Sequence, residues 1–246
     1  MKAFVLAEPG KVKWFDAPEP QLVPYGAILK PVAVTPCSSD VHTVFGGGSK
    51  KQDNLVLGHE CIAEVVSVGE NVCDFKTGDR VAVPAITPDW REKSIQEGND
   101  RHASAPFSGH QLGRTQPGVF SERFLIKDAD TTLAHIPQKI SEEQALMSVD
   151  VVTTGFTGAE YADIKIGDTV CVIGIGPIGL MAVAGAKLRG AARIIAVGTR
   201  PKCVQLAKYY GATDVLSYKE GDIVQQVKEL TNGIGVDATI IAGGTA

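Results

Sequence analysis

Two short segments near the N-terminus carry side chains that suit a divalent metal. One contains Cys37, Ser39 and His42, and the other contains His59 and Glu60. Thiolate, imidazole and carboxylate groups all bind zinc, and a catalytic zinc keeps one position open for water or substrate. The Ser39 hydroxyl and the His42 imidazole could move a proton beside such a centre. The residue types therefore predict a catalytic metal site.

A further ligand is expected from the middle of the chain. Asp150 follows the β-rich first half and is the natural third ligand after Cys37 and His59. Glu60 is expected to be either a fourth, displaceable ligand or a base beside the metal. Zinc binds carboxylate oxygen as well as sulfur and nitrogen, so this donor set is chemically consistent.

A glycine-rich turn lies far downstream and has the pattern of a dinucleotide-binding fingerprint. It follows an apolar strand, opens a helix and consists of Gly174, Ile175, Gly176, Pro177, Ile178 and Gly179. The first glycine allows the tight turn, the second lets the backbone approach a pyrophosphate, and the third lets helix and strand pack closely. The helix N-terminus offers free N–H groups and a partial positive charge to the phosphates.

The end of the next strand favours NADP over NAD. NAD-binding folds place Asp or Glu there for the ribose 2′-hydroxyl, whereas this chain has Gly198, Thr199 and Arg200. The glycine makes room, the threonine hydroxyl can donate, and the guanidinium suits a phosphate dianion. Tyr218, at the end of the third strand, is expected to close the pocket. The alternative is that Arg200 is only a solvated residue at the start of a helix.

A metal that polarises oxygen and a cofactor that accepts hydride together predict a dehydrogenase. An alcohol does not ionise at neutral pH, but zinc lowers the pKa of bound water from 15.7 to about 7 and should act similarly on an alcohol. The zinc-polarised alkoxide can then release hydride to the nicotinamide. Because the proton must leave a dry site, Ser39 beside the zinc and His42 nearer the surface are expected to form a relay.

The elements that must position these residues change in character near residue 151. The first half has short strands broken by Gly and Pro, which indicates a small barrel or sandwich. The second half alternates continuous apolar strands with helices, which predicts a parallel, doubly wound sheet in an α/β fold. We therefore expect two domains, 1–150 and 151–246. Strands of the second are predicted at 169–173, 193–197, 214–218 and 236–242.

The predicted second sheet is incomplete. A dinucleotide-binding sheet normally contains two βαβαβ halves, and the chain supplies the first half and one strand of the second. The last strand would be an apolar, unpaired edge, which proteins usually avoid. The chain is therefore expected to be a fragment, or the ordered part, of a longer protein.

Composition argues against several classes of protein. The net charge of −4, from 28 acidic and 24 basic residues, argues against binding nucleic acid or a membrane surface. No apolar run approaches the ~18 residues of a membrane helix, and Glu8 comes too early for a signal core. Five cysteines without a C-x-x-C pair favour a reducing cytoplasm. Cys61 and Cys73 lack ligand-like spacing and are expected in the core.

The chain resembles the zinc-dependent medium-chain alcohol dehydrogenases, and more closely their NADP-dependent secondary-alcohol branch. Gly58-His59-Glu60, with Gly69 and Val72 at the expected distances, is similar to the zinc signature of that family. The closer resemblance rests on the segments 36–42, 83–90 and 174–200, and it covers essentially the whole chain.

The resemblance implies a GroES-like catalytic domain at 1–150 and a Rossmann NADP-binding domain at 151–246. It implies one catalytic zinc on Cys37, His59 and Asp150, with Glu60 able to join, and no structural zinc. The cysteine-free segment 86–118 agrees with the latter. Small secondary alcohols and ketones are the implied substrates, and a homotetramer is the implied assembly. The residues expected around NADP are the glycine-rich turn together with Thr154, Gly198, Thr199, Arg200 and Tyr218.

Two residues depart from the family pattern: the first adds one methyl group, which is expected to be tolerated, and the second leaves the substrate range open. Ala63 stands where the zinc signature has glycine, and His110 stands where the branch usually carries a tryptophan that lines the substrate pocket. The alternatives are a zinc-free NADPH quinone or enoyl reductase, a polyol dehydrogenase, and a non-catalytic nucleotide- or zinc-binding fragment. The joint presence of Cys37, His59 and Asp150 counts against the zinc-free reductase.

Overall fold

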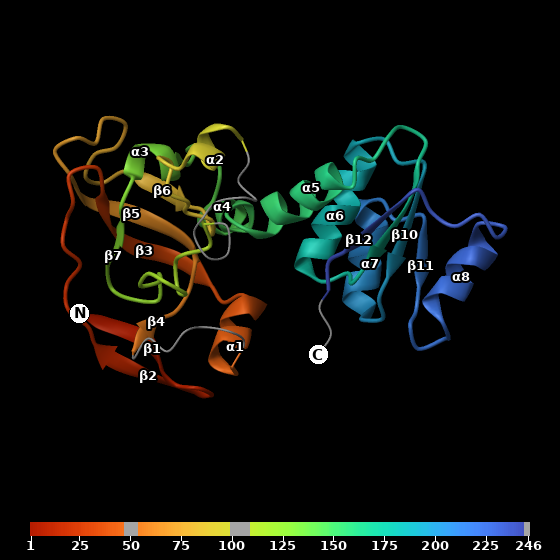
Figure 1. Ribbon diagram of the computed structural model, residues 1–246, viewed down its shortest axis with the longest axis horizontal. Coiled ribbons are helices and arrows are strands. Elements are labelled where there is room, and N and C mark those ends of the chain that lie inside the picture. Colours follow the sequence, from red (N-terminus) through yellow and green to blue (C-terminus); the bar gives the residue numbers. More distant parts are fainter. Residues whose placement is uncertain (47–53, 99–108, 244–246) are drawn as a thin grey trace. The chain divides into compact units, whose positions relative to one another are not determined.

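The chain divides into two compact units, Met1–Asp150 and Val151–Ala246. The computed structural model describes residues 1–46, 54–98 and 109–243 (Figure 1). The central part of the predicted polar segment 86–118 and the last three residues therefore lie outside the description. Each unit has its own hydrophobic core.

The first unit contains two antiparallel sheets, with strand orders β2-β1-β4 and β7-β3-β5-β6-β8. Its strands are β1 (Lys2–Glu8), β2 (Lys11–Asp16), β3 (Ala27–Thr35), β4 (Leu55–Val56), β5 (Glu60–Val68), β6 (Arg80–Val83), β7 (Phe124–Ile126) and β8 (Ala134–His135). Its helices are α1 (Ser38–Val44), α2 (Lys93–Gln96), α3 (Ala129–Thr132) and α4 (Glu142–Ser148). The β-rich character that the sequence indicates is confirmed.

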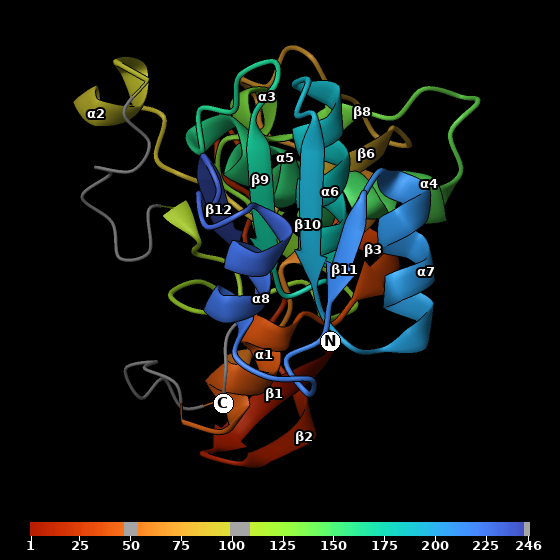
Figure 2. The same cartoon turned by 90° about the vertical axis from the view of Figure 1, so that its right-hand side faces the viewer.

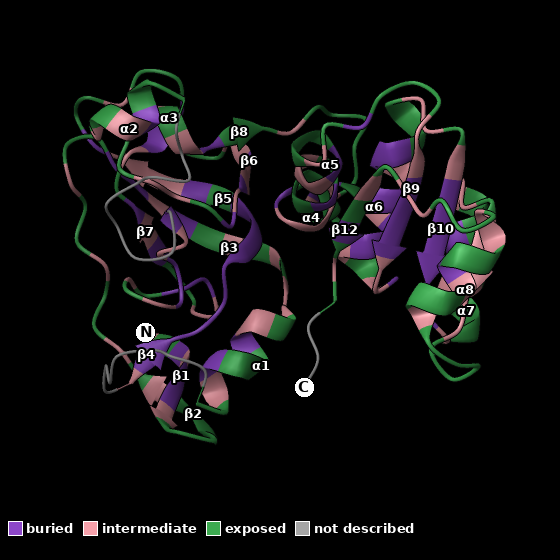
Figure 3. Ribbon diagram, turned by 45° about the vertical axis from the view of Figure 1, so that its right-hand side comes forward, coloured by how far each residue is buried: buried purple, intermediate pink, exposed green. Residues whose placement is uncertain are grey.

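The core of the first unit lies against the five-stranded sheet. Leu29 of β3, Val65 of β5, Val81 of β6 and Phe124 of β7 are almost completely buried within one cluster. Figure 3 shows buried segments of β3 and β5 in purple. Burying a side chain of this size contributes about 1.5–3 kcal/mol. A one-residue slip would turn the apolar side chains of a strand toward solvent, so the core fixes the pairing of β3 with β5.

The second unit is a four-stranded parallel sheet of order β11-β10-β9-β12 (Figure 2). Its strands are β9 (Thr169–Ile173), β10 (Arg193–Val197), β11 (Asp214–Leu216) and β12 (Ala238–Ile241), and its helices are α5 (Val151–Tyr161), α6 (Pro177–Leu188), α7 (Pro201–Tyr210) and α8 (Ile223–Leu230). One cluster packs α5, α6 and α7 on the sheet, and another packs α8 with Cys171, Ile195 and Val197. Alternate strand residues thus face different helices, and the predicted doubly wound parallel sheet is confirmed.

Residues with strong local backbone or capping preferences stand at the helix ends of the second unit. Pro177 and Pro201 each start a helix, where proline has no N–H bond to lose. Gly211 ends α7 at φ +123°, a conformation that favours glycine. The third strand ends at Leu216, two residues before the predicted end, and α8 starts after Asp222, whose carboxylate accepts from the Gln225 N–H at 2.8 Å.

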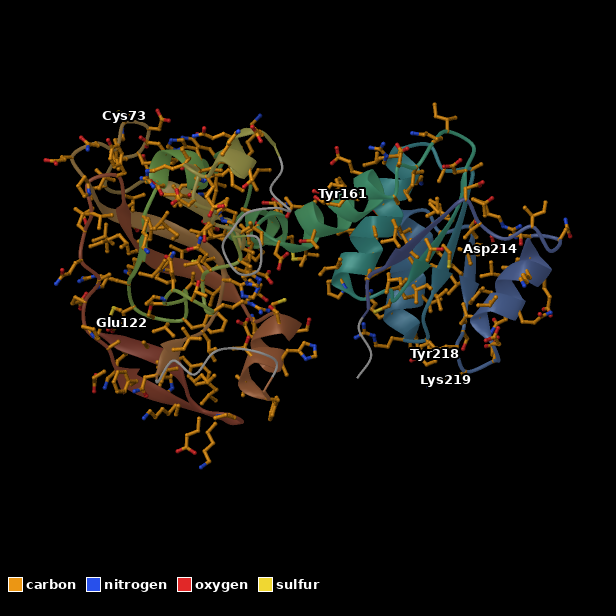
Figure 4. The ribbon with its side chains drawn as sticks, viewed as in Figure 1. Cys73, Glu122, Tyr161, Asp214, Tyr218 and Lys219 are labelled. Atoms are coloured by element: carbon orange, nitrogen blue, oxygen red, sulfur yellow. The ribbon has the colours of Figure 1, made fainter. Side chains whose placement is uncertain are left out.

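The two cysteines expected in the core have different environments. Cys61 is completely buried, as predicted. Cys73 is exposed in the loop between β5 and β6, so its predicted burial is wrong (Figure 4). The Asp130 carboxylate accepts the N–H groups of Cys73 and Asp74, at 2.8 and 3.0 Å, which fixes the loop with the thiol on the surface. Within the described ranges, no helix combines the length and apolarity that crossing a bilayer requires.

Candidate metal site and nucleotide-binding turn

Strand pairing brings the two N-terminal metal-binding segments together. Thr35 at the end of β3 lies opposite Glu60 at the start of β5. Because the strands are antiparallel, the chain that leaves β3 passes beside the residues that enter β5. Cys37 and His59 therefore meet at one edge of the sheet.

Helix α4 brings Asp150, the last residue of the first unit, to the same edge of the sheet. Ala145 and Val149 pack with Ile62 of β5 in one buried cluster. The N–H of Ala85, just after β6, donates to the Val149 carbonyl at 3.1 Å. Asp150 is the next residue after Val149. The packing of α4 on the sheet therefore brings Asp150 to the other donors, which are far away in the sequence.

The predicted donor residues form one cluster. Ligand atoms of Cys37, His59, Glu60 and Asp150 all lie within 4.8 Å of one another. His59 Nε2 is 3.8 Å from Glu60 Oε1 and 3.7 Å from Asp150 Oδ2. The residues His59 and Glu60 are each 2% exposed. Glu60 Oε2 is buried and has no hydrogen-bond partner within the described part of the chain.

Asp40 orients the cluster and was not identified from the sequence. Its Oδ1 lies 3.3 Å from His59 Nδ1, so the other ring nitrogen of His59 is directed at the donors. The same carboxylate accepts the N–H groups of Cys37 at 2.9 Å and Gly58 at 3.2 Å. A carboxylate behind a metal-binding histidine fixes its tautomer and orientation. Its only sequence signal is its place three residues after Cys37 at the start of a helix.

The cluster concentrates negative charge in a buried place. Burial raises the pKa of Cys37, but hydrogen bonds with His59 and Ser39 outweigh it and lower that pKa to about 7. Burial, with the charges of Asp150 and Cys37, raises the pKa of Glu60 to about 8. Burial disfavours a charged His59, yet hydrogen bonds to Asp150, Asp40 and Cys37 raise its pKa to about 11. The surrounding acidic groups thus favour a positive charge on His59 when no metal is bound.

These features fit a zinc ion. The donors are one sulfur, one imidazole nitrogen and two carboxylates, which are all zinc ligands. A cation would replace the proton on His59 and would provide the missing partner of Glu60 Oε2. A metal therefore satisfies both the charge and the unpaired oxygen of this cluster.

The predicted relay residues share α1 but not the same environment. Ser39 is half-buried and its Oγ lies 3.4 Å from His59 Nε2. His42 lies in the last turn of α1 and is exposed. No hydrogen bond joins Ser39 to His42 in the regions that the structure describes, so their coupling remains a prediction.

His110 packs against the same cluster. Its ring meets the His59 ring edge to face, with centroids 4.5 Å apart and an interplanar angle of 66°. Burial and the charge of His59 lower the pKa of His110 to about 4, which favours the neutral imidazole.

The glycine-rich turn joins β9 to α6 in a form that depends on its glycines. Gly174 has φ +90°. A Cβ on Gly179 would lie 1.8 Å from the carbonyl oxygen of Gly174, so only glycine allows the helix to approach the turn this closely. Gly176 is the N-cap of α6, with the exposed Pro177 at its first position. The turn thus has the tight, close-packed backbone form that the sequence predicts for residues 174–179.

The residues predicted to recognise a 2′-phosphate lie beside this turn. A Cβ on Gly198 would lie 2.2 Å from Ile175 Cγ1, so the glycine makes room for that side chain. Arg200 Nη2 would lie 3.4 Å from a Cβ on Gly176, which places its guanidinium at the turn. The Thr199 hydroxyl donates to Tyr218 Oη at 2.9 Å. Tyr218 lies just after the end of β11 (Figure 4).

Comparison with known proteins agrees with both halves of this architecture. Residues 24–138 match the alcohol dehydrogenase GroES-like domain, and residues 177–246 match the zinc-binding dehydrogenase family. The chain is 56% identical over 246 residues to the NADP-dependent isopropanol dehydrogenase of Thermoanaerobacter brockii, covering 100% of this chain and 70% of that protein. The chain belongs to the zinc-dependent alcohol dehydrogenase family. A second relative, the NADP-dependent isopropanol dehydrogenase of Clostridium beijerinckii, is 52% identical over 244 residues, covering 99% of this chain and 70% of that protein.

Solved structures of alcohol dehydrogenases share the fold. Zinc-dependent alcohol dehydrogenase 2 from Streptococcus pneumonia superposes with a TM-score of 0.88 at 30% identity, over 99% of this chain and 69% of that one. Alcohol dehydrogenase TADH from Thermus sp. ATN1 gives 0.87 at 28% identity, over 100% and 71%. The predicted α/β fold, with a GroES-like and a Rossmann part, is confirmed.

Within this dehydrogenase, the structure gathers the predicted zinc ligands more closely than the predicted cofactor residues. The four ligands form one cluster, and the glycine-rich turn adjoins Gly198 and Arg200. Ile178 is half-buried in α6, and Thr154 lies on the exposed side of α5. The role of Thr154 remains a prediction.

Proposed function

We propose that the chain is an NADP-dependent secondary alcohol dehydrogenase that also reduces the corresponding small ketones. The observation that carries the proposal is the cluster of Cys37, His59, Glu60 and Asp150 within 4.8 Å. The relatives named NADP-dependent isopropanol dehydrogenase support the cofactor and the substrate class. A zinc-free quinone or enoyl reductase would not need this buried donor set.

Residues of the first unit have different proposed roles at the metal. Cys37, His59 and Asp150 would hold zinc, and Glu60 would join them or leave as substrate enters. Zinc, when bound, supplies Lewis-acid polarisation of the substrate oxygen. Asp40 keeps His59 aimed at the site through the 3.3 Å contact with Nδ1.

The proton of the alcohol is proposed to leave through α1. Ser39 Oγ, within 3.4 Å of His59 Nε2, is close enough to the donors to accept a hydrogen bond from the alcohol and pass its proton on. His42 is exposed on the same helix, so its imidazole can exchange that proton with solvent.

The second unit is proposed to bind NADP rather than NAD. The glycine-rich turn and the N-terminus of α6 would bind the pyrophosphate. Arg200 would pair with the 2′-phosphate, because its guanidinium lies beside Gly176 and no Asp or Glu occupies the end of β10. Thr199 and Tyr218, joined by their hydroxyls, would form the outer wall of that pocket.

The test combines metal content with cofactor choice. The folded protein should contain about one zinc per chain and should reduce 2-butanone faster with NADPH than with NADH. Cys37→Ser should abolish zinc binding, whereas Cys203→Ser, at a half-buried cysteine of the second unit, should not. Arg200→Ala should weaken NADPH binding at least tenfold and leave NADH binding nearly unchanged. Absence of zinc from the folded protein, or equal use of NADH, would contradict the proposal.

A cytoplasmic location and a homotetrameric assembly complete the proposal. The five cysteines are free, as expected in a reducing compartment. Sedimentation velocity on the purified protein would test the assembly, and a monomer at working concentration would exclude the tetramer.

A further inference from the structure

His110 has an unpaired nitrogen next to the candidate metal site. Its Nε2 is shielded from solvent and lacks a hydrogen-bond partner among the described residues. Its ring lies against His59, the central donor of the cluster. Leaving a buried polar group unpaired costs free energy. A molecule that supplies a partner there would recover that energy.

Two backbone hydrogen bonds join the segment 85–87 to the residues that precede Asp150 and His110. The N–H of Thr87 donates to the Gly109 carbonyl at 2.8 Å, and the N–H of Ala85 donates to the Val149 carbonyl at 3.1 Å. The segment 85–87 therefore connects the residue before Asp150 with the residue before His110. Ile86, between the two bonds, is 46% exposed and offers apolar surface. An exposed apolar residue thus lies on the segment that is hydrogen-bonded to the residues before Asp150 and His110.

We propose that His110 determines substrate specificity by hydrogen-bonding a hydroxyl on the carbon next to the reacting one. The chain then favours α-hydroxy ketones and vicinal diols over alkyl ketones and alcohols of the same shape. This inference rests on the proposed function. A hydroxyl both donates and accepts, so it pairs with Nε2 in either tautomer of the ring. The χ2 torsion of histidine is broad, which lets the ring turn its Nε2 toward a bound molecule.

A matched pair of ketones tests the idea. In 3-methyl-2-butanone, a methyl group replaces the hydroxyl of 3-hydroxy-2-butanone, so shape is nearly constant and only the hydrogen bond changes. A site with a polar group left unpaired discriminates against the analogue that lacks the partner. We expect the zinc-loaded protein with NADPH to favour the hydroxy ketone about tenfold or more in kcat/KM.

Variants identify the residue responsible. His110→Phe keeps a ring and removes the nitrogen, so it should lower the preference for the hydroxy ketone about tenfold. His110→Gln should restore part of the preference. His135→Phe changes an exposed histidine of the same unit whose ring stacks on Phe75, and it should leave the ratio unchanged. A ratio that is the same in wild type and His110→Phe, with both proteins folded by circular dichroism, would overturn the inference.

A binding measurement keeps the test independent of turnover. In the zinc-loaded protein with ¹⁵N-labelled histidine, the signal of His110 Nε2, assigned by its loss in His110→Phe, should move with 3-hydroxy-2-butanone but not with 3-methyl-2-butanone. Identical behaviour with the two ketones would overturn the inference. Failure to reduce any ketone would instead count against the proposed function, and the two failures are therefore distinguishable.

Discussion

The carboxylate of Asp40 connects three separate parts of the candidate metal site. It contacts the Nδ1 of His59 and accepts the N–H groups of Cys37 and Gly58. The donors on either side of it therefore keep their positions before any metal arrives. This preorganisation increases metal affinity, because the ligands lose less freedom on binding.

Replacing this carboxylate should weaken zinc binding without removing a ligand. Asp40→Asn is expected to lower zinc affinity about 10- to 100-fold, measured by competition with a chromophoric chelator. Asp130→Asn is the matched control, because Asp130 also accepts two backbone N–H groups, but in the exposed loop of Cys73. Equal effects of the two variants on zinc affinity would show that Asp40 has only a structural role.

At the scale of the elements, the packing of α6 against the turn after β9 leaves no room for a side chain at Gly179. Gly179→Ala would place a methyl group 1.8 Å from the Gly174 carbonyl, so backbone must move. We expect a loss of about 1–3 kcal/mol in the free energy of unfolding, measured by urea denaturation. Gly158→Ala is the control: it is also helical, but its nearest neighbour would be 3.4 Å away. It should be neutral or stabilising by up to about 1 kcal/mol.

The starts of β10 and β11 are joined by a charged pair that should make stability depend on pH. Arg193 donates to both oxygens of Asp214, at 2.8 and 3.1 Å, and to the Leu230 carbonyl at the end of α8. The Arg193 bonds hold the pKa of Asp214 below its usual range. This stabilisation is therefore complete above the unfolded-state pKa of about 3.9 and is lost as pH falls through the lowered folded-state pKa.

Asp214→Asn should consequently lower the melting temperature at pH 7 and should have a smaller effect near pH 3. Circular dichroism melts at the two pH values would measure the difference. Asp163→Asn breaks an exposed pair with Lys165, two residues away, and should have little effect at either pH. An Asp214→Asn effect that does not change with pH would contradict this assignment.

Local signals in the sequence predict the elements better than the contacts between them. Pro177, Pro201 and Gly211 mark helix ends because their backbone preferences act within a few residues. The role of Asp40 depends on the pairing of β3 with β5, and the exposure of Cys73 depends on Asp130, far along the chain. Both features depend on contacts between residues far apart in the chain, and local sequence patterns do not predict such contacts.

In the candidate site, too, some features can be predicted from the sequence and others depend on tertiary contacts. Residue types, together with the resemblance to the alcohol dehydrogenase family, lead to the prediction of Cys37, His59, Glu60 and Asp150 as ligands, and the structure brings these four side chains into one cluster. The unpaired nitrogen of His110 depends on which atoms surround it in the folded chain. The sequence therefore predicts the donors, whereas the structure is needed for the groups that orient them and adjoin them.

At the scale of the whole molecule, the two units have separate cores and separate proposed binding sites. All four proposed zinc ligands belong to Met1–Asp150, and the glycine-rich turn belongs to Val151–Ala246. A ligand stabilises the part of the protein whose folded form it binds. Metal and cofactor should therefore stabilise different units.

Zinc removal should accordingly act on one unit. After chelation, amide hydrogen exchange should become faster in β5 and α1 and should be unchanged in β9 and β10, as measured by mass spectrometry. NADPH should produce the opposite pattern, with protection in the second unit. A uniform change across both units on chelation would contradict independent stabilisation.

The location of Asp150 also has a consequence for synthesis of the protein. Cys37, His59 and Glu60 leave the ribosome early, but the last proposed ligand is the final residue of the first unit. Domains generally fold in order as they emerge during translation. The complete metal-binding set thus exists only when the first unit has been fully translated, so a nascent chain acquires its full donor set at the point where that unit becomes able to fold.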